Sequence, residues 1–224
     1  MADQVADLTD DFQQAETLTD RAYRELEEDI VTLRIPPGSM VSEVQLSRRL
    51  GVGRTPVREA LQRLAREWLV VIMPRRGIFV SEIDVGRQLR LLDARRVIER
   101  LLAQSAARRC NAAQRAQFAQ IAAGMDRAAK RSDDIAFMRF DRSFNLLMLE
   151  AGGNEFAAAS MGLMNGLSRR FWYVHYKQVA DLPLAARLHA ATARAVAAGN
   201  EDEAAAASDA LVDYIQAFAR KTIE

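Results

Sequence analysis

The N-terminal third of the chain shows two kinds of hydrophobic spacing, one helical and one typical of strands. Apolar side chains recur every three or four residues up to Leu64, which predicts amphipathic helices. Three helices are expected: one capped by Thr17 or Thr19 and ending near 33, one over 43–50 capped by Ser42, and one over 54–67. Two β-prone runs, 69–73 and 78–80, then flank a Pro-Arg-Arg-Gly turn, which predicts a hairpin.

The rest of the chain is dense in alanine and leucine, and proline is absent from 84 until Pro183. The apolar spacing stays helical, with breaks at Asn, Gly and Asp positions. Six helices are expected: 84–109, 111–130, 133–151, 154–179, 181–198 and 201–222. Because no fixed-length repeat is present, these helices predict a bundle rather than a solenoid.

Helix, glycine turn, helix and hairpin, in that order, are typical of a winged helix-turn-helix. The predicted fold class is therefore mainly α: an N-terminal winged helix-turn-helix plus a C-terminal all-α helical bundle of about six helices. We expect three parts: a mobile acidic leader over 1–17, a DNA-binding domain over 18–82, and an all-α domain for effector binding and dimerisation over 83–224.

The formal net charge of +1 conceals an uneven distribution. Residues 1–20 carry six acidic side chains and no basic one, whereas residues 42–80 carry eight arginines against three glutamates. A basic stretch of this size can neutralise DNA phosphates, although a solvated basic surface has the same composition.

Other features of the composition limit the class of protein. The single cysteine, Cys110, excludes an intramolecular disulfide and fits a reducing compartment. No apolar run reaches the roughly 18 residues needed to span a bilayer, and the N-terminus lacks the pattern of a secretory signal. We therefore expect a cytoplasmic protein without a membrane partner. With only two histidines, neither beside a candidate nucleophile, we do not expect an enzyme.

The third predicted helix opens with chemistry suited to DNA. In a helix-turn-helix the second helix enters the major groove with its N-terminal residues facing the bases. Arg54 and Arg58 lie four apart and project from one face, and arginine can bond both acceptors of a guanine. Thr55 and the free amides of the first turn favour a phosphate. A solvated basic helix on an ordinary core would show the same spacing, so periodicity and charge alone leave both interpretations open.

The amino-acid sequence of this segment resembles that of the GntR family of bacterial regulators. The matching residues are Pro37, Gly38, Glu43, Leu46, the run from Gly51 to Leu61, Leu64, Arg75, Arg76 and Gly77. The resemblance implies contacts with operator DNA by Arg54, Thr55, Pro56, Arg58 and Gly77, and more loosely by Arg48, Arg75 and Arg76. Two departures stand out: Gly53 replaces a usual serine or threonine, and Trp68 replaces a usual glycine.

A winged helix followed by an all-helical domain is similar to the FadR subfamily, whose sensor is the FCD domain. The resemblance implies a bundle that binds carboxylate effectors, here with Arg96, Asp141, Asn145 and His189. Many such sensors hold a divalent metal with one aspartate and three histidines, and zinc, nickel or manganese suits those ligands. Asp141, Asn145 and His189 match three of the metal positions, but Asn145 replaces the first histidine. Leu211 replaces the last histidine, and a small shift would offer Asp213 or Tyr214 instead.

Three interpretations of these polar residues stay open. They form an incomplete metal site; or they bind an effector directly, with Arg96 gripping its carboxylate bidentately; or they are hydrogen-bonded core residues. In the last case Arg96 pairs with Glu99 or Asp93, and the aromatic run 171–176 is core rather than pocket lining.

The resemblance as a whole implies a homodimeric repressor that binds double-stranded operator DNA and responds to a small carboxylate metabolite. A protein-interaction module that uses the winged helix for assembly is the first alternative. A metal-dependent hydrolase is the second, and it would need clustered Glu, His or nucleophile–base pairs.

Overall fold

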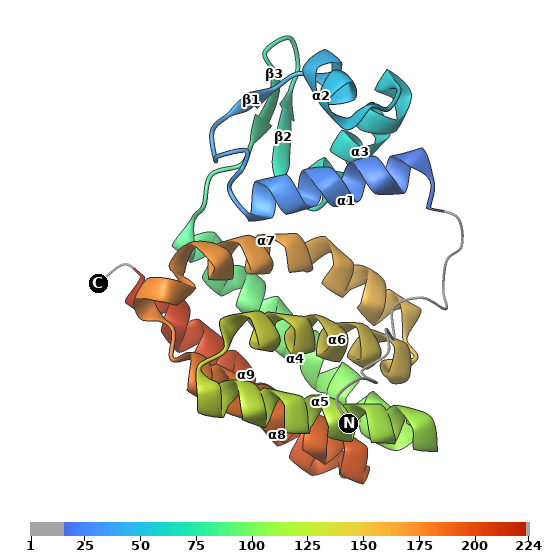
Figure 1. Cartoon of the computed structure of the whole chain (residues 1–224), viewed down its shortest axis with the longest axis vertical. Helices are drawn as coiled ribbons and strands as arrows, with labels where there is room; N and C mark the ends of the chain where they lie inside the picture. Colours follow the sequence, from blue (N-terminus) through green and yellow to red (C-terminus); the bar gives the residue numbers. More distant parts are fainter. Residues whose placement is uncertain (1–15, 223–224) are drawn as a thin grey trace, which may run out of the picture. The chain divides into compact units, whose positions relative to one another are not determined.

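The computed structural model describes residues 16–222, and the chain divides into two compact units, up to Glu82 and from Ile83 onward (Figure 1). Each unit has its own hydrophobic core. The expected mobile leader, 1–17, lies outside the described residues except for its last two, and Glu16 forms an ion pair with Arg24.

The N-terminal unit combines helices with a small antiparallel sheet. Its elements are α1 (Leu18–Val31), β1 (Met40–Val41), α2 (Glu43–Leu50), α3 (Arg54–Arg66), β2 (Val70–Met73) and β3 (Gly77–Val80). The predicted hairpin is β2 and β3, with Val71 opposite Phe79. The strand β1 was not predicted, because two residues are too short to show an alternating pattern; it pairs with β3 and completes the order β1-β3-β2.

The core of this unit lies where α1 packs on α3. The buried face of α1 includes Leu26 and Ile30, and that of α3 includes Val57, Leu61 and Leu64. Because these apolar positions follow the helical period, the opposite face of α3 is turned to solvent. The sequence prediction of all three helices is confirmed.

The helix starts in this unit differ in how they are capped. Thr17 caps α1: its Oγ1 accepts a hydrogen bond from the backbone N–H of Asp20 at 3.1 Å. Ser42 stands at the N-cap of α2 but forms no side-chain cap hydrogen bond, so its predicted capping role is wrong. Its backbone is extended, and Glu43 supplies the negative charge at this helix start instead.

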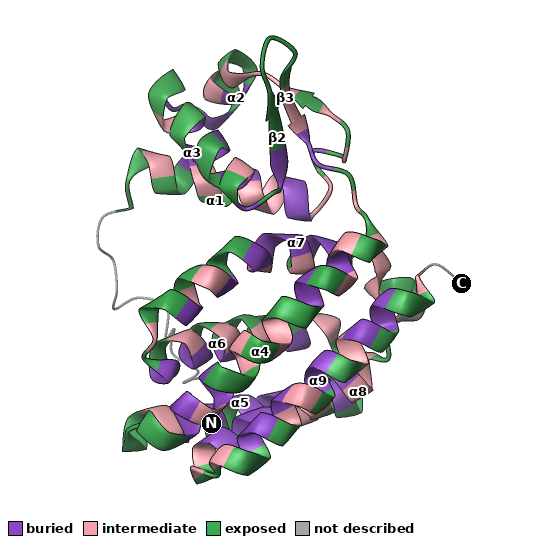
Figure 2. Cartoon of the chain, turned by 180° about the vertical axis from the view of Figure 1, so that it is seen from behind, coloured by how far each residue is buried: buried purple, intermediate pink, exposed green. Residues whose placement is uncertain are grey.

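The C-terminal unit is an all-α bundle, as predicted. Its helices are α4 (Val85–Arg109), α5 (Ala112–Arg131), α6 (Asp134–Gly152), α7 (Glu155–Val179), α8 (Leu182–Ala198) and α9 (Glu201–Lys221). The helix α5 packs along α8, and α4 packs along α9. Figure 2 shows the buried residues on the inward faces of these helices. Between residues 16 and 222, no helix combines the length and the apolar character that a membrane span requires.

Polar residues fix where the bundle helices begin. Asn111 forms a capping box with Gln114, and Asp133, Asn154, Asp181 and Asn200 each accept a hydrogen bond from a backbone N–H in the first turn that follows. The buried face of α8 is mostly alanine, which lets its backbone approach α5 closely. The helix α8 matters below because it carries His189.

We predict that Gly199→Ala destabilises the bundle. Gly199 ends α8 with a φ of +76, where an L-residue costs roughly 1–2 kcal/mol, and a Cβ would lie 2.6 Å from Nη1 of Arg115. Chemical denaturation should therefore show a lower free energy of unfolding. Gly162→Ala in α7 is the control, because its Cβ would meet nothing within 4 Å. Equal stability of the two variants would contradict the assignment.

Candidate nucleic-acid interface and interior polar cluster

The start of α3 is exposed and uncapped. Gly51, with a φ of +64, turns the chain after α2, and Gly53 occupies the N-cap of α3, where no side chain of the described chain supplies a cap hydrogen bond. The first-turn amides therefore face outward as donors, which suits an anion. The side chains of Arg54 and Arg58 are 63% and 55% exposed.

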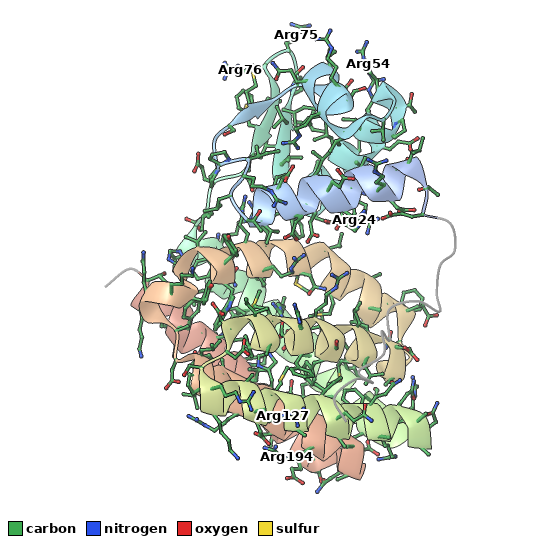
Figure 3. The ribbon with its side chains drawn as sticks, in the orientation of Figure 1. Arg24, Arg54, Arg75, Arg76, Arg127 and Arg194 are labelled. Atoms are coloured by element: carbon green, nitrogen blue, oxygen red, sulfur yellow. The ribbon has the colours of Figure 1, made fainter. Side chains whose placement is uncertain are left out.

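The hairpin tip adds positive charge at the same end of the unit. Figure 3 shows Arg54, Arg75 and Arg76 projecting from that end, whereas Arg24 lies on α1. Arg75 adopts a φ of +63, and Gly77 a φ of +112, so the turn holds both arginines on a tight loop. Arg48 on α2 and Thr55 on α3 are also exposed, and Pro56 is half-buried in the first turn of α3. The N-terminal unit thus gathers the predicted DNA-contacting residues on α2, α3 and the hairpin.

Sequence reasoning treated Glu43 only as a match to the family pattern, and the structure gives it a specific contact. Nε of Arg58 donates to Oε1 of Glu43 at 2.9 Å, and Nη2 donates to Oε2 at 2.8 Å. Nη2 of Arg54 lies 3.8 Å from the same Oε2. The hydrogen bond from Arg58 lowers the pKa of Glu43, and the hydrogen bond to Glu43 raises the pKa of Arg58. The Glu43 carboxylate therefore interacts with both arginines for which the sequence predicted contacts with bases.

In the C-terminal unit, the predicted residues Asp141, Asn145 and His189 come together; we call them the interior polar cluster. Nε2 of His189 lies 3.0 Å from Oδ1 of Asp141, and Nδ2 of Asn145 donates to the same oxygen at 3.1 Å. His189 is buried between the rings of Phe137 and Phe144, with centroids 5.5 and 5.6 Å away.

The contacts of His189 indicate a doubly protonated ring. Its Nδ1 lies 2.8 Å from the carbonyl oxygen of Ala185, which can only accept, and its Nε2 faces a carboxylate. Burial, the largest single influence, lowers the pKa of His189. The hydrogen bond and charge of Asp141, the Ala185 carbonyl and the charge of Glu99 together outweigh it, so the pKa is raised. The contacts of His189 therefore favour the protonated ring over the neutral one.

This donor set does not fit the divalent metal that the family resemblance suggested. Nδ1 of His189 faces the Ala185 carbonyl, Nε2 lies 3.0 Å from Oδ1 of Asp141, and Asn145 turns its amide nitrogen, not an oxygen ligand, toward the same Asp141 oxygen. Leu211 is buried and apolar. The shifted alternatives are engaged elsewhere, since Asp213 pairs with Arg96 and the Tyr214 hydroxyl donates to the carbonyl of Asp181. Within residues 16–222, no three His, Cys, Asp or Glu side chains converge.

The structure places Arg96 away from this cluster. Its guanidinium bonds to Asp213, to Gln216 at 3.2 Å and to the carbonyl of Asp209, and so ties α4 to α9. The preceding residue, Arg95, is the inward one: its side chain is 11% exposed and pairs with Glu99 one turn on. The charge of Glu99 acts on His189, which puts Arg95 in the electrostatic surroundings of the cluster.

Two further polar groups were missed by sequence reasoning. The Trp172 indole nitrogen and the Ser168 hydroxyl are buried, one turn apart on α7, and neither has a hydrogen-bond partner in the described part of the chain. The Trp172 ring lies 6.1 Å from Phe137, which also contacts His189. From the sequence, Trp172 is expected only as part of the aromatic run 171–176, either in the core or in the lining of a pocket. A serine four residues before a tryptophan is too common to be a signal.

Comparison with known families agrees with both units. Residues 18–80 match the description "Bacterial regulatory proteins, gntR family", and residues 90–214 match the FCD domain. The second match alone spans more than half of the chain.

Individual relatives are regulators as well. The chain is 30% identical to the HTH-type transcriptional repressor RspR of Escherichia coli (strain K12) over 167 residues, which cover 75% of this chain and 73% of that protein. It is 28% identical to the Nta operon transcriptional regulator of Aminobacter aminovorans over 79% of this chain and 82% of that one. Among solved structures, E. coli McbR/YncC aligns with a TM-score of 0.78 at 17% identity, covering 93% and 99% of the two chains, which supports the fold.

The His189–Asp141 pair predicts a pH-dependent contribution to stability. Because the folded pKa of His189 is raised, this contribution is fully present below the unfolded value of about 6.5 and is lost as pH rises through the folded value. We expect Asp141→Asn to lower the melting temperature most in acid and least in base. Asp126→Asn, which breaks the exposed pair with Arg194, is the control. A deficit for Asp141→Asn that does not shrink with pH would contradict the pairing.

Proposed function

The chain belongs to the gntR family of bacterial regulatory proteins in its FadR-type arrangement with an FCD domain, and on that premise we propose a repressor released from its operator by a small carboxylate. Members of this family are transcriptional regulators, so the chain is a DNA-binding transcriptional regulator and not an enzyme. The proposal concerns three things beyond family membership: the role as a repressor, the class of effector, and the residues that bind DNA and effector.

The exposed, uncapped start of α3 is the observation that carries the DNA-reading part. Arg54 and Arg58 project from it beside free first-turn amides, and Arg75 and Arg76 stand at the same end of the unit (Figure 3). We assign Arg58 and Arg54 to guanine edges in the major groove, since arginine matches both guanine acceptors. Thr55, Pro56 and Arg48 position the phosphate backbone, and Arg75, Arg76 and Gly77 follow the neighbouring groove or strand.

We assign dimerisation to the C-terminal unit. Val97 and Leu101, one turn apart on α4, are 69% and 44% exposed, and an apolar pair of this kind is typical of a surface that a partner covers. A two-fold homodimer would present two α3 helices to a pseudo-palindromic operator, with half-sites about one helical turn apart. Family membership also favours the cytoplasm, where the chromosome is.

The effector would bind beside the interior polar cluster. The unpaired N–H of Trp172 and hydroxyl of Ser168 require acceptors, and a carboxylate offers two oxygens to donors one helical turn apart. The rings of Phe137 and Phe218, 6.1 and 4.8 Å from Trp172, would cover an apolar body. Arg95 replaces Arg96 in our assignment as the cation of this region.

Effector binding would shift the equilibrium between two arrangements of the dimer, one that binds the operator and one that does not. A ligand that binds one arrangement of the dimer more tightly than another favours that arrangement by the difference in its binding free energies. Repression is supported by the relative RspR, which is named a transcriptional repressor. A protein-interaction module would use the winged helix without duplex DNA, and the salt dependence of DNA binding separates the two functions.

We predict that Arg58→Ala weakens binding to a duplex selected by the wild-type protein by about 1–3 kcal/mol and relaxes sequence preference. Arg66→Ala removes the same charge from the far end of α3 and should change affinity little. Fluorescence anisotropy on selected and scrambled duplexes measures both quantities. If Arg58→Ala matches Arg66→Ala in both, α3 does not read the bases.

We also predict that Ser168→Ala blunts the response to carboxylates. Removing a buried unpaired hydroxyl should leave the free protein as stable or more so, while a carboxylate that raises the wild-type melting temperature should raise that of the variant less. Ser160→Ala on the same helix, whose hydroxyl already donates to the Phe156 carbonyl at 2.8 Å, is the control. A panel of small mono- and dicarboxylates serves as probe, and equal shifts in all three proteins would refute the assignment.

A further inference from the structure

We propose that Glu43 is a specificity-determining residue of the DNA interface, because it holds the guanidinium of Arg58 in the orientation that reads a guanine. This inference rests on the proposed role of Arg58 in base reading. It assigns to an acidic side chain a part in DNA recognition that its charge alone would not suggest.

The geometry of the pair leaves the reading edge of Arg58 free. Glu43 takes the Nε–H and one N–H of Nη2, at 2.9 and 2.8 Å, which is the side of the guanidinium nearest the chain. Nη1 and the second N–H of Nη2 remain, and they form the outward edge of the fork. A fork of two parallel N–H groups is what O6 and N7 of a guanine accept. Glu43 therefore binds one edge of the Arg58 guanidinium and, in doing so, orients the other edge toward the DNA.

Glu43 is itself held in place. It is the first residue of α2, where the positive helix end favours a carboxylate, and its side chain is only 20% exposed. The buried Leu46 and Leu50 fix α2 within the unit. The pair thus joins two helices, so the orientation of Arg58 depends on α2 as well as on α3. A long arginine side chain restrained at both ends has less freedom to swing to a phosphate.

The negative charge of Glu43 has opposite effects on the specificity of DNA binding and on its overall affinity. A carboxylate beside the DNA interface repels phosphates, so it lowers binding to every duplex. It also lies 3.8 Å from Nη2 of Arg54, which reduces the positive potential of the second arginine. A group that weakens general binding while ordering a base-reading side chain raises the ratio of specific to non-specific affinity. Glu43 therefore lowers the affinity for DNA in general and raises the discrimination between sequences.

The test compares Glu43→Gln with a variant of matched charge. Glu59→Gln removes one negative charge from α3, where the Glu59 carboxylate accepts a hydrogen bond from Thr19. Both full-length variants are titrated with a duplex selected by the wild-type protein from a random pool and with a scrambled duplex, over a series of salt concentrations. We expect Glu43→Gln to bind the scrambled duplex more tightly and to lose about five- to tenfold in the ratio of affinities. Glu59→Gln should keep that ratio within about twofold.

A double variant identifies the path of the effect. If Glu43 acts through Arg58, adding Glu43→Gln to Arg58→Ala leaves the ratio of affinities where Arg58→Ala alone puts it. A further loss in the double variant, or a ratio for Glu43→Gln equal to that of Glu59→Gln, overturns the inference. Thermal unfolding of each variant reports whether α2 has loosened, and a discrimination loss that tracks a lower melting temperature also counts against it. If Arg58→Ala itself keeps the wild-type ratio, the proposed function fails and not merely the role of Glu43.

Discussion

The burial of one face of α3 against α1 is the constraint on which the DNA-binding unit depends. Val57, Leu61 and Leu64 follow the helical period and are almost fully buried. Burial of this stripe fixes α3 against α1, and Arg54 and Arg58, at the N-terminal end of the helix, remain 63% and 55% exposed. Hydrophobic packing thus positions the helix that carries the charged groups. Glu43 then refines the direction of Arg58.

In the bundle a different constraint operates, because the buried His189 needs polar partners and the partly exposed Asp141 is one of them. His189 and Asp141 compensate one another, and each ring nitrogen of His189 has an oxygen partner. A metal would take the one ring nitrogen that faces Asp141 together with further ligands, and the chain has Asn145 and Leu211 where the family pattern has histidine. The chain thus has a histidine and an aspartate at this place in the FCD domain, without two of the histidines that the family's metal pattern includes. Within residues 16–222, the Trp172 N–H and the Ser168 hydroxyl are buried without a hydrogen-bond partner, and in the proposed function they meet the ligand.

Much of this was readable from the sequence, since helix periods, capping residues and the run from Gly51 to Leu61 are local signals. The failures have physical reasons. The family pattern points to Arg96, but one residue turns a helix by about 100°, and only the contacts of Arg96 with α9 and of Arg95 with Glu99 show which arginine is the less exposed. The departure at Trp68 was visible in the sequence, but only the structure shows its φ of +58, the conformation that a usual glycine adopts without cost. The contact between Glu43 and Arg58 joins residues 15 apart, beyond any periodic signal.

In the proposed complex, the guanidinium groups at the start of α3 meet guanine edges in the major groove. Methylation interference tests it most directly, because a methyl group on guanine N7 blocks that edge and leaves the phosphates unchanged. We expect that methylation of one or two guanines, repeated with two-fold symmetry in a selected duplex, abolishes binding, and that methylation of one of these guanines no longer changes binding by Arg58→Ala. Binding that tolerates methylation at every guanine N7 would contradict it.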